Sequence, residues 1–175
     1  MRKLKVTELN RLSIAEYKAE SKLPIAVVLD NIRSLYNVGS IFRSCDALRI
    51  EEIYLCGITA CPPNAEIHKT ALGAEDSVSW RYFADAATAI NELKNKKYTI
   101  CAVEQADPSI MLNEWTPQAG EKYAVVFGHE VKGIAQAIVD LCDYCIEIPQ
   151  FGTKHSLNVA VAAGIVLWEM GNKLR

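Results

Sequence analysis

The amino-acid sequence predicts an α/β fold in which helices flank a mostly parallel sheet. Short apolar runs alternate with helical segments along the 175 residues, a pattern typical of parallel strands joined by crossover helices. The clearest run is continuous rather than alternating, as expected for a strand buried on both faces. Half of the residues are hydrophobic, which is enough for one full core in a chain of this length.

The first residues predict a surface helix that precedes the sheet. Residues 7–22 have the composition of an exposed helix, and Ser13 with Glu16 has the spacing of a capping box. We therefore expect an N-terminal helical arm over residues 1–23 and one α/β domain over residues 24–175.

Five apolar runs predict the strands, and polar loops with glycine or proline follow most of them. Caps and helical spacing predict helices between the strands. Asn37 is the expected cap of the helix over residues 38–48, Asp85 that of the helix over residues 84–95, and Ser156 that of the long last helix. The predicted strands are 25–29, 52–56, 98–103, 122–127 and 145–148; 134–141 is a short helix, 66–80 a short helix then an extended piece, and 106–120 the longest loop.

Composition and charge narrow the classes of function. The chain has no run of about 20 apolar residues and no signal-peptide pattern, so we expect a cytoplasmic protein. The net charge of −2 argues against a protein that coats nucleic acids, although basic residues cluster locally. The six cysteines are expected to be thiols, and the lone CxxC at Cys142 and Cys145 has no second pair at zinc-ligand spacing. We therefore predict no metal site.

Polar residues gather in loops that follow predicted strands. Because ligands of open α/β sheets bind beyond the carboxyl ends of the strands, these loops are the candidate site. Neither of the common nucleotide-binding loops, GxGxxG or GxxxxGK[ST], is present. The candidates are Asn31, Arg33, Asn37 and Arg43; Glu104 and Gln105; Gly128, His129, Glu130 and Gly133; and Gln150, Gly152, Lys154, His155, Ser156 and Asn158.

Each candidate also has a purely structural interpretation. Asn37 and Ser156 can serve only as helix caps. Arg43 and Glu130 can be ordinary surface residues. From the residues alone, the prediction stops at a ligand-binding α/β domain with a polar cleft.

Three motifs taken together are more specific. Residues 37–43 (NVGSIFR) resemble the first motif, N-x-G-x-x-x-R, of the SpoU/TrmH-type RNA 2′-O-ribose methyltransferases of the SPOUT superfamily. Residues 127–134 (FGHEVKGI) resemble the second motif of that family, G-x-E-x-x-G. Residues 148–163 (IPQFGTKHSLNVAVAA) resemble the third, and all three occur in the order and spacing of the family.

The resemblance implies a fold and a cofactor. The α/β sheet of the family ends in a C-terminal trefoil knot, which binds S-adenosylmethionine largely through backbone atoms. Residues 24–175 would be the catalytic domain. By position, the cofactor-binding residues would be Val103, Glu104, Gly128, Ile148 and Leu157.

The resemblance also implies a reaction, the transfer of a methyl group from S-adenosylmethionine to a ribose 2′-hydroxyl of RNA, with tRNA ahead of rRNA. The catalytic residues would be Asn37, Arg43, Glu130, Ser156 and Asn158. A guanidinium, with a pKa above about 12, is a poor base. Arg43 would therefore bind an RNA phosphate and stabilise the developing alkoxide.

Members of this family act as dimers, and the last helix, apolar nearly all round, fits a homodimer. Two other interpretations stay open. One is a non-catalytic RNA-binding protein of the same fold. The other is an unrelated α/β enzyme of phosphate esters, with Arg43 and the start of the last helix as its anion site.

Overall fold

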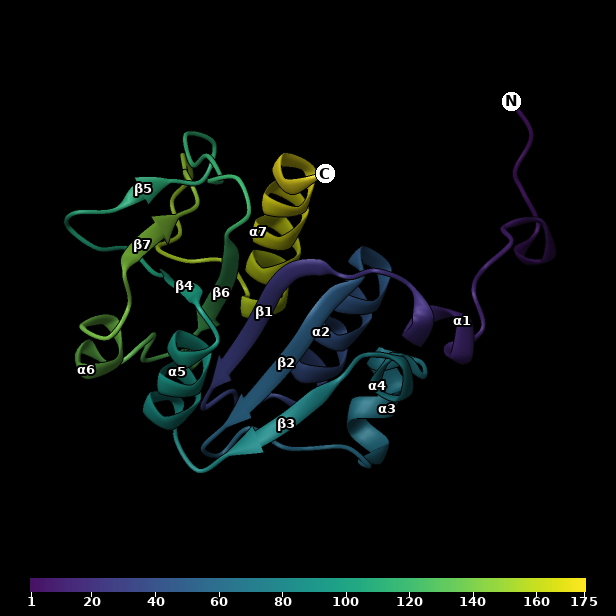
Figure 1. The fold of residues 1–175 in the computed structure, drawn as a ribbon, viewed down its shortest axis with the longest axis horizontal. Coiled ribbons are helices and arrows are strands. Elements are labelled where there is room, and N and C mark those ends of the chain that lie inside the picture. Colours follow the sequence, from purple (N-terminus) through teal and green to yellow (C-terminus); the bar gives the residue numbers. More distant parts are fainter.

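The computed structural model describes residues 1–175, the side chain of Val6 excepted, and contains one seven-stranded sheet (Figure 1). The strands are β1 (Leu23–Asp30), β2 (Ile50–Cys56), β3 (Trp80–Phe83), β4 (Tyr98–Val103), β5 (Ile110–Met111), β6 (Lys122–Phe127) and β7 (Tyr144–Glu147). Their order in the sheet is β3-β2-β1-β6-β4-β7-β5, and every neighbouring pair is parallel. The predicted α/β class is confirmed.

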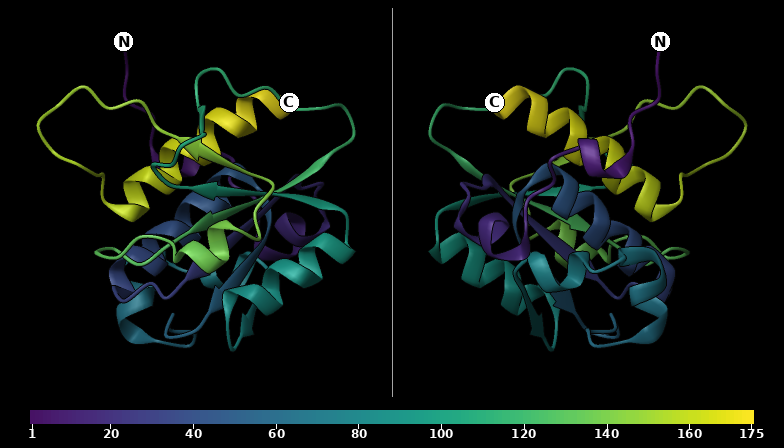
Figure 2. Two further views of the ribbon diagram at one scale, coloured as in Figure 1. Left: turned by 90° about the vertical axis from the view of Figure 1, so that its left-hand side faces the viewer. Right: turned by 90° about the vertical axis from the view of Figure 1, so that its right-hand side faces the viewer.

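Helices cover both faces of the sheet, and Figure 2 shows α7 and α5 on opposite sides of it. One core joins α1 (Ile14–Ala19), α2 (Leu35–Leu48), α3 (Ala65–Ala71), α4 (Ala74–Ser77) and α7 (Val159–Leu174) to the sheet. The other face is covered by α5 (Ala86–Asn95) and the short α6 (Gln136–Val139), while a 3₁₀ turn, η1 (Val6–Glu8), lies in the arm.

The central strand explains the continuous apolar run. Val27 and Leu29 enter the core beneath α2 and α7, whereas Ala26 and Val28 enter the core beneath α5. All four are fully buried. Because successive residues of a strand point to opposite faces, both sets must be apolar when both faces are covered.

All five predicted strands exist, but the prediction missed two. The strand β3 follows the expected extended piece, and its sequence, WRYF, mixes aromatic and charged residues at the half-buried edge of the sheet. The two-residue strand β5 lies at the opposite edge, inside the predicted long loop. Edge strands need fewer apolar residues, so β3 lacks the continuous apolar run that marks central strands, while β5 is apolar but only two residues long.

Three helix predictions were wrong in their details. The helix expected over 7–22 is only α1, although the capping box of Ser13 and Glu16 is confirmed. The cap of α2 is Ser34, whose hydroxyl accepts from the N–H of Asn37. The cap of α7 is Asn158 rather than Ser156, since its carboxamide accepts from the N–H groups of Ala160 and Val161. The Asn37 side chain is instead directed toward Glu130 and Asn158, and Ser156 lies two residues before the cap of α7.

Asp85 does cap α5, as predicted, through the N–H of Thr88.

Within the part of the chain that the structure describes, no helix is both long and apolar enough to cross a membrane. The trefoil knot implied by the resemblance stays a prediction.

Candidate functional site

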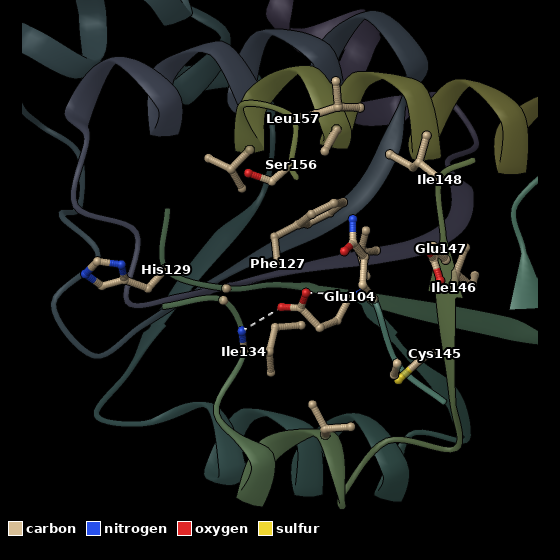
Figure 3. A pocket seen from close by; sticks show the side chains of 18 of the residues that line it. Glu104, Phe127, His129, Ile134, Cys145, Ile146, Glu147, Ile148, Ser156 and Leu157 are labelled. Atoms are coloured by element: carbon tan, nitrogen blue, oxygen red, sulfur yellow. Dashed lines mark hydrogen bonds between the residues drawn. The ribbon is translucent and has the colours of Figure 1, made fainter. Parts of the chain in front are cut away.

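A large cavity of about 940 Å³ lies beyond the carboxyl ends of β4, β6 and β7, where strand-end ligands of α/β sheets are expected (Figure 3). We call it the strand-end cavity. Its wall is built from the loop after β4, the loop after β6, the strand β7 and the segment that leads into α7. The predicted residues that line it are Val103, Glu104, Gln105, Gly128, His129, Glu130, Gly133, Ile148, Gln150, Ser156, Leu157 and Asn158.

A chain of hydrogen bonds joins the three sequence motifs at one side of this cavity. The carboxylate of Glu130 accepts from the Asn37 side-chain amide at 3.1 Å. The Asn37 carbonyl oxygen accepts in turn from the Asn158 side-chain amide, also at 3.1 Å. Asn158 meanwhile caps α7. The motifs are therefore held in register by side chains that lie about 90 to 120 positions apart in the sequence.

Glu130 also holds the loop in front of α2. Its two carboxylate oxygens accept from the backbone N–H of Arg33 at 3.0 Å and of Ser34 at 2.8 Å. Partial burial by itself raises the pKa of this carboxyl, but the N–H donors outweigh it, so the pKa of Glu130 lies below its ordinary value. The ionised Glu130 carboxylate consequently fixes the positions of its hydrogen-bond donors. A carboxylate with a lowered pKa is a poor proton acceptor, so Glu130 is a poor base.

Glu104 fixes the second motif from the opposite side. Its carboxylate accepts from the N–H of Ile134 at 3.1 Å, the bond drawn in Figure 3, and from the N–H of Gln105 at 3.0 Å. Gly133 lies against it with φ at +66°, and a Cβ there would be 2.3 Å from the Glu104 carboxylate. The positive φ favours glycine at this position, and any larger residue would displace the Glu104 carboxylate.

The segment that leads into α7 is tied to the loop after β4. The Gln105 side-chain amide donates to the backbone carbonyl of His155 at 2.7 Å. Ser156 and Leu157 follow directly and face the cavity across from Glu104 (Figure 3). His129 lies at the cavity edge, where its Nδ1 accepts from the N–H of Val131 at 3.0 Å and shapes the turn after Gly128.

Acidic residues outnumber basic ones in the wall of the cavity. The carboxylates are Glu104, Asp107, Glu130 and Glu147. The prediction named neither Asp107 nor Glu147. Both lie at or just beyond the carboxyl end of a strand, β4 and β7, so the rule that located the other candidates could have found them. Within the described residues, no group of His, Cys, Asp and Glu side chains is arranged to hold a metal ion.

Arg43 lies outside the strand-end cavity. It follows Asn37 by six residues, which on an α-helix is about 9 Å along the axis and about 120° around it. Its side chain is exposed and lines a separate, shallow pocket with residues of α3. The structure thus brings Asn37, Glu130 and Asn158 together and leaves Arg43 apart from them.

Known proteins share this fold and this stretch of sequence. The chain is 30% identical to the 23S rRNA (guanosine-2′-O-)-methyltransferase RlmB of Neisseria meningitidis serogroup B, over 85% of this chain and 58% of the relative. It superposes on an AdoMet-bound rRNA methyltransferase from Sinorhizobium meliloti with a TM-score of 0.80 and 25% identity, over 89% of this chain and 61% of that one. It superposes on the TrmH/SpoU tRNA modifying enzyme of A. aeolicus with a TM-score of 0.79 and 24% identity, over 91% and 81% of the two chains.

The first two curated relatives are longer than this chain, which spans 63% and 58% of their lengths. The match to the family model runs from residue 24 to residue 168 and includes all three motifs. With its parallel sheet, its strand-end cavity and its motifs joined by hydrogen bonds, the chain belongs to the SpoU rRNA Methylase family.

Proposed function

We propose that this protein transfers a methyl group from S-adenosylmethionine to a ribose 2′-hydroxyl of RNA. The observation that carries the proposal is the hydrogen-bond chain from Glu130 through Asn37 to Asn158, which assembles the three family motifs beside one cavity. We further propose that residues 24–175 form the catalytic domain, that a trefoil knot contains the segment before α7, and that residues 1–23 are an accessory arm.

The residues of the strand-end cavity suit this cofactor. S-adenosylmethionine carries a sulfonium and an ammonium group, and four carboxylates line the cavity. Apolar side chains, among them Phe127, Ile134 and Ile148, offer surface for its adenine ring. We propose that Val103, Glu104, Gly128, Ile148 and Leu157 bind it. When bound, the cofactor supplies an electrophilic methyl group and leaves as an uncharged thioether.

The residues of the chain would then act mainly by positioning. Because the methyl group is already activated, the remaining task is to align a hydroxyl with it and to accommodate the proton that leaves. Asn37 and Asn158 present amide groups at the cavity edge, and Glu130 fixes Asn37. The hydroxyl of Ser156, in the cavity wall, can donate a hydrogen bond to the RNA or the cofactor.

We propose that Arg43 acts across a homodimer. Exposed apolar residues form one stripe on and before α7, Leu157, Val161, Ile165 and Trp168, which we call the α7 stripe. It borders an apolar groove of about 590 Å³ that shares Ile148 with the strand-end cavity. A second copy that covers the stripe would therefore adjoin this cavity. Since α2 packs beside α7, the Arg43 of each copy would flank the interface and face the cavity of its partner.

Two classes of RNA are the candidates, and we propose tRNA first and rRNA second. The solved relative of A. aeolicus is a tRNA modifying enzyme, and the relative of Neisseria meningitidis acts on 23S rRNA. The expected location is the cytoplasm.

Calorimetry with S-adenosylmethionine tests the cofactor assignment. We expect one site per chain, and tighter binding of S-adenosylmethionine than of its demethylated product, because the acidic cavity favours the sulfonium charge. An absence of binding would refute the assignment. Binding of RNA without methyl transfer would favour a non-catalytic RNA-binding protein.

A further inference from the structure

A shallow pocket of about 420 Å³ lies between α2 and α3, apart from the strand-end cavity. We call it the α2–α3 pocket. Its two charged residues are both basic, Arg43 from α2 and Lys69 from α3. Small or hydroxyl-bearing residues complete its lining: Ser40, Ser44, Ala47 and Thr70. Such a lining offers cationic and hydroxyl donors to an anion and presents no carboxylate from the described residues that form it.

A close helix contact holds these donors together. A Cβ at Gly39 would lie 2.2 Å from the Thr70 hydroxyl oxygen and 2.3 Å from the carbonyl oxygen of Ile67. Because glycine alone permits this approach, α3 lies directly on α2. Ser40, which follows Gly39, and Lys69, which precedes Thr70, therefore border one pocket. The glycine of the first motif thus has a structural role in building the α2–α3 pocket.

Two donors of this pocket are available to a ligand, because neither the guanidinium of Arg43 nor the hydroxyl of Ser40 has a hydrogen-bond partner within the described part of the chain. The hydroxyls of Ser44 and Thr70 already donate to the backbone carbonyls of Ser40 at 3.1 Å and of Tyr36 at 3.0 Å. Lys69 is 59% exposed and is restrained by Glu66 of its own helix, at 2.6 Å. Two cations that line one small pocket repel each other, and an anion between them would remove that repulsion.

We propose that the α2–α3 pocket binds one backbone phosphate of the RNA and that Lys69 is a phosphate-binding residue of this protein. The inference rests on the proposed function, whose reaction requires RNA beside Arg43. A planar guanidinium can bind a phosphate through two donors, and an ammonium adds a point charge. The pocket is shallow and open, which suits a phosphate on a continuous backbone better than an enclosed small molecule.

Glu66 holds the ammonium group that a phosphate would need from Lys69. Its carboxylate accepts from the Lys69 ammonium and from the Tyr36 hydroxyl, both at 2.6 Å. Glu66 is not part of the pocket lining. An RNA phosphate must compete with this carboxylate for the ammonium. Removing the charge of Glu66 should therefore strengthen RNA binding.

The test measures RNA affinity against salt concentration, with S-adenosylmethionine affinity and methyl transfer measured in parallel. Lys69→Ala should weaken RNA binding about fivefold and lower the salt slope by about 0.7 to 0.9. Glu66→Gln should tighten RNA binding by about two- to threefold. Lys94→Ala is the matched control, because Lys94 is exposed on α5, on the opposite face of the sheet. Cofactor affinity should be unchanged in all three variants.

If Lys69→Ala behaves like Lys94→Ala, or Glu66→Gln weakens binding, the proposal is wrong even when the wild-type protein methylates RNA. If millimolar inorganic phosphate binds the wild type in a Lys69-dependent way without displacing RNA, the pocket is a site for a small anion, which also overturns it. A Lys69-dependent salt slope in a protein that transfers no methyl group would support the phosphate site and refute the proposed function instead.

Discussion

Replacing Glu130 with glutamine tests the hydrogen-bond chain at the centre of the site. The carboxylate accepts from two backbone N–H groups and from the Asn37 amide. A glutamine keeps the shape but has a single acceptor oxygen, and its NH₂ group would face a donor. A hydrogen bond to a charged group contributes about 1.5 to 3 kcal/mol. Water can replace part of this at the exposed Arg33, so we expect a loss of about 2 kcal/mol in the free energy of unfolding.

The pH dependence of this loss identifies its cause. The folded-state pKa of Glu130 is lowered from its ordinary 4.5, so its ionised form stabilises the fold fully above that value. This contribution disappears as the pH falls through the folded-state pKa, where the protonated side chain resembles glutamine. The difference between wild type and Glu130→Gln should therefore be about 2 kcal/mol at pH 7 and should shrink toward zero as the pH falls through the folded-state pKa.

Urea unfolding at several pH values measures this difference. Glu114→Gln serves as the control, since Glu114 is exposed and its side chain has no hydrogen-bond partner among the described residues. It should change stability by less than about 0.5 kcal/mol at any pH. A Glu130→Gln penalty that does not shrink as the pH is lowered below the ordinary pKa of 4.5 would refute the account, because the lost interaction would then not depend on the charge.

Two further predictions concern α7. Lys173 donates to the carbonyl oxygens of Leu112, Asn113 and Trp115 at 2.7 to 3.2 Å, so Lys173→Met should cost about 2 kcal/mol in urea unfolding while Lys94→Met costs little. An equal cost for both variants would show that the bonds contribute nothing. Val161→Asp, in the α7 stripe, should convert a dimer into a monomer in light scattering, whereas Ile58→Asp, equally exposed elsewhere, should not. A wild-type protein that is monomeric in light scattering would refute the proposed dimer.

The central strands and the place of the site could be predicted because both depend on simple rules. A parallel strand covered on both faces must be apolar throughout, and Ala26 to Leu29 meet that condition. Ligand sites of such sheets lie beyond the strand ends, and the loops after β4, β6 and β7 do form one cavity. The edge strands could not be predicted in the same way, because β3 and β5 bury little.

The details of the site depend on partners that are distant in the sequence. Asn37 and Ser156 are residue types that commonly cap helices. In the structure, however, the Asn37 side chain is directed toward Glu130 and Asn158, and Ser156 lies in the cavity wall. Local pattern cannot distinguish these uses of an amide or a hydroxyl, because the deciding contact is some 90 or more residues away. The separation of Arg43 from this cluster follows from its helical phase relative to Asn37, which the sequence does contain once α2 is placed.

The most direct test of the proposed function is the transfer of a labelled methyl group from S-adenosylmethionine to RNA. Purified protein would be incubated separately with unmodified total tRNA and total rRNA, followed by digestion and nucleoside mapping. We predict a labelled 2′-O-methylnucleoside in one of the two pools and a loss of at least about 100-fold in rate with Arg43→Ala at unchanged cofactor affinity. Label in neither pool, or label on a base instead of a ribose, would contradict the proposed reaction.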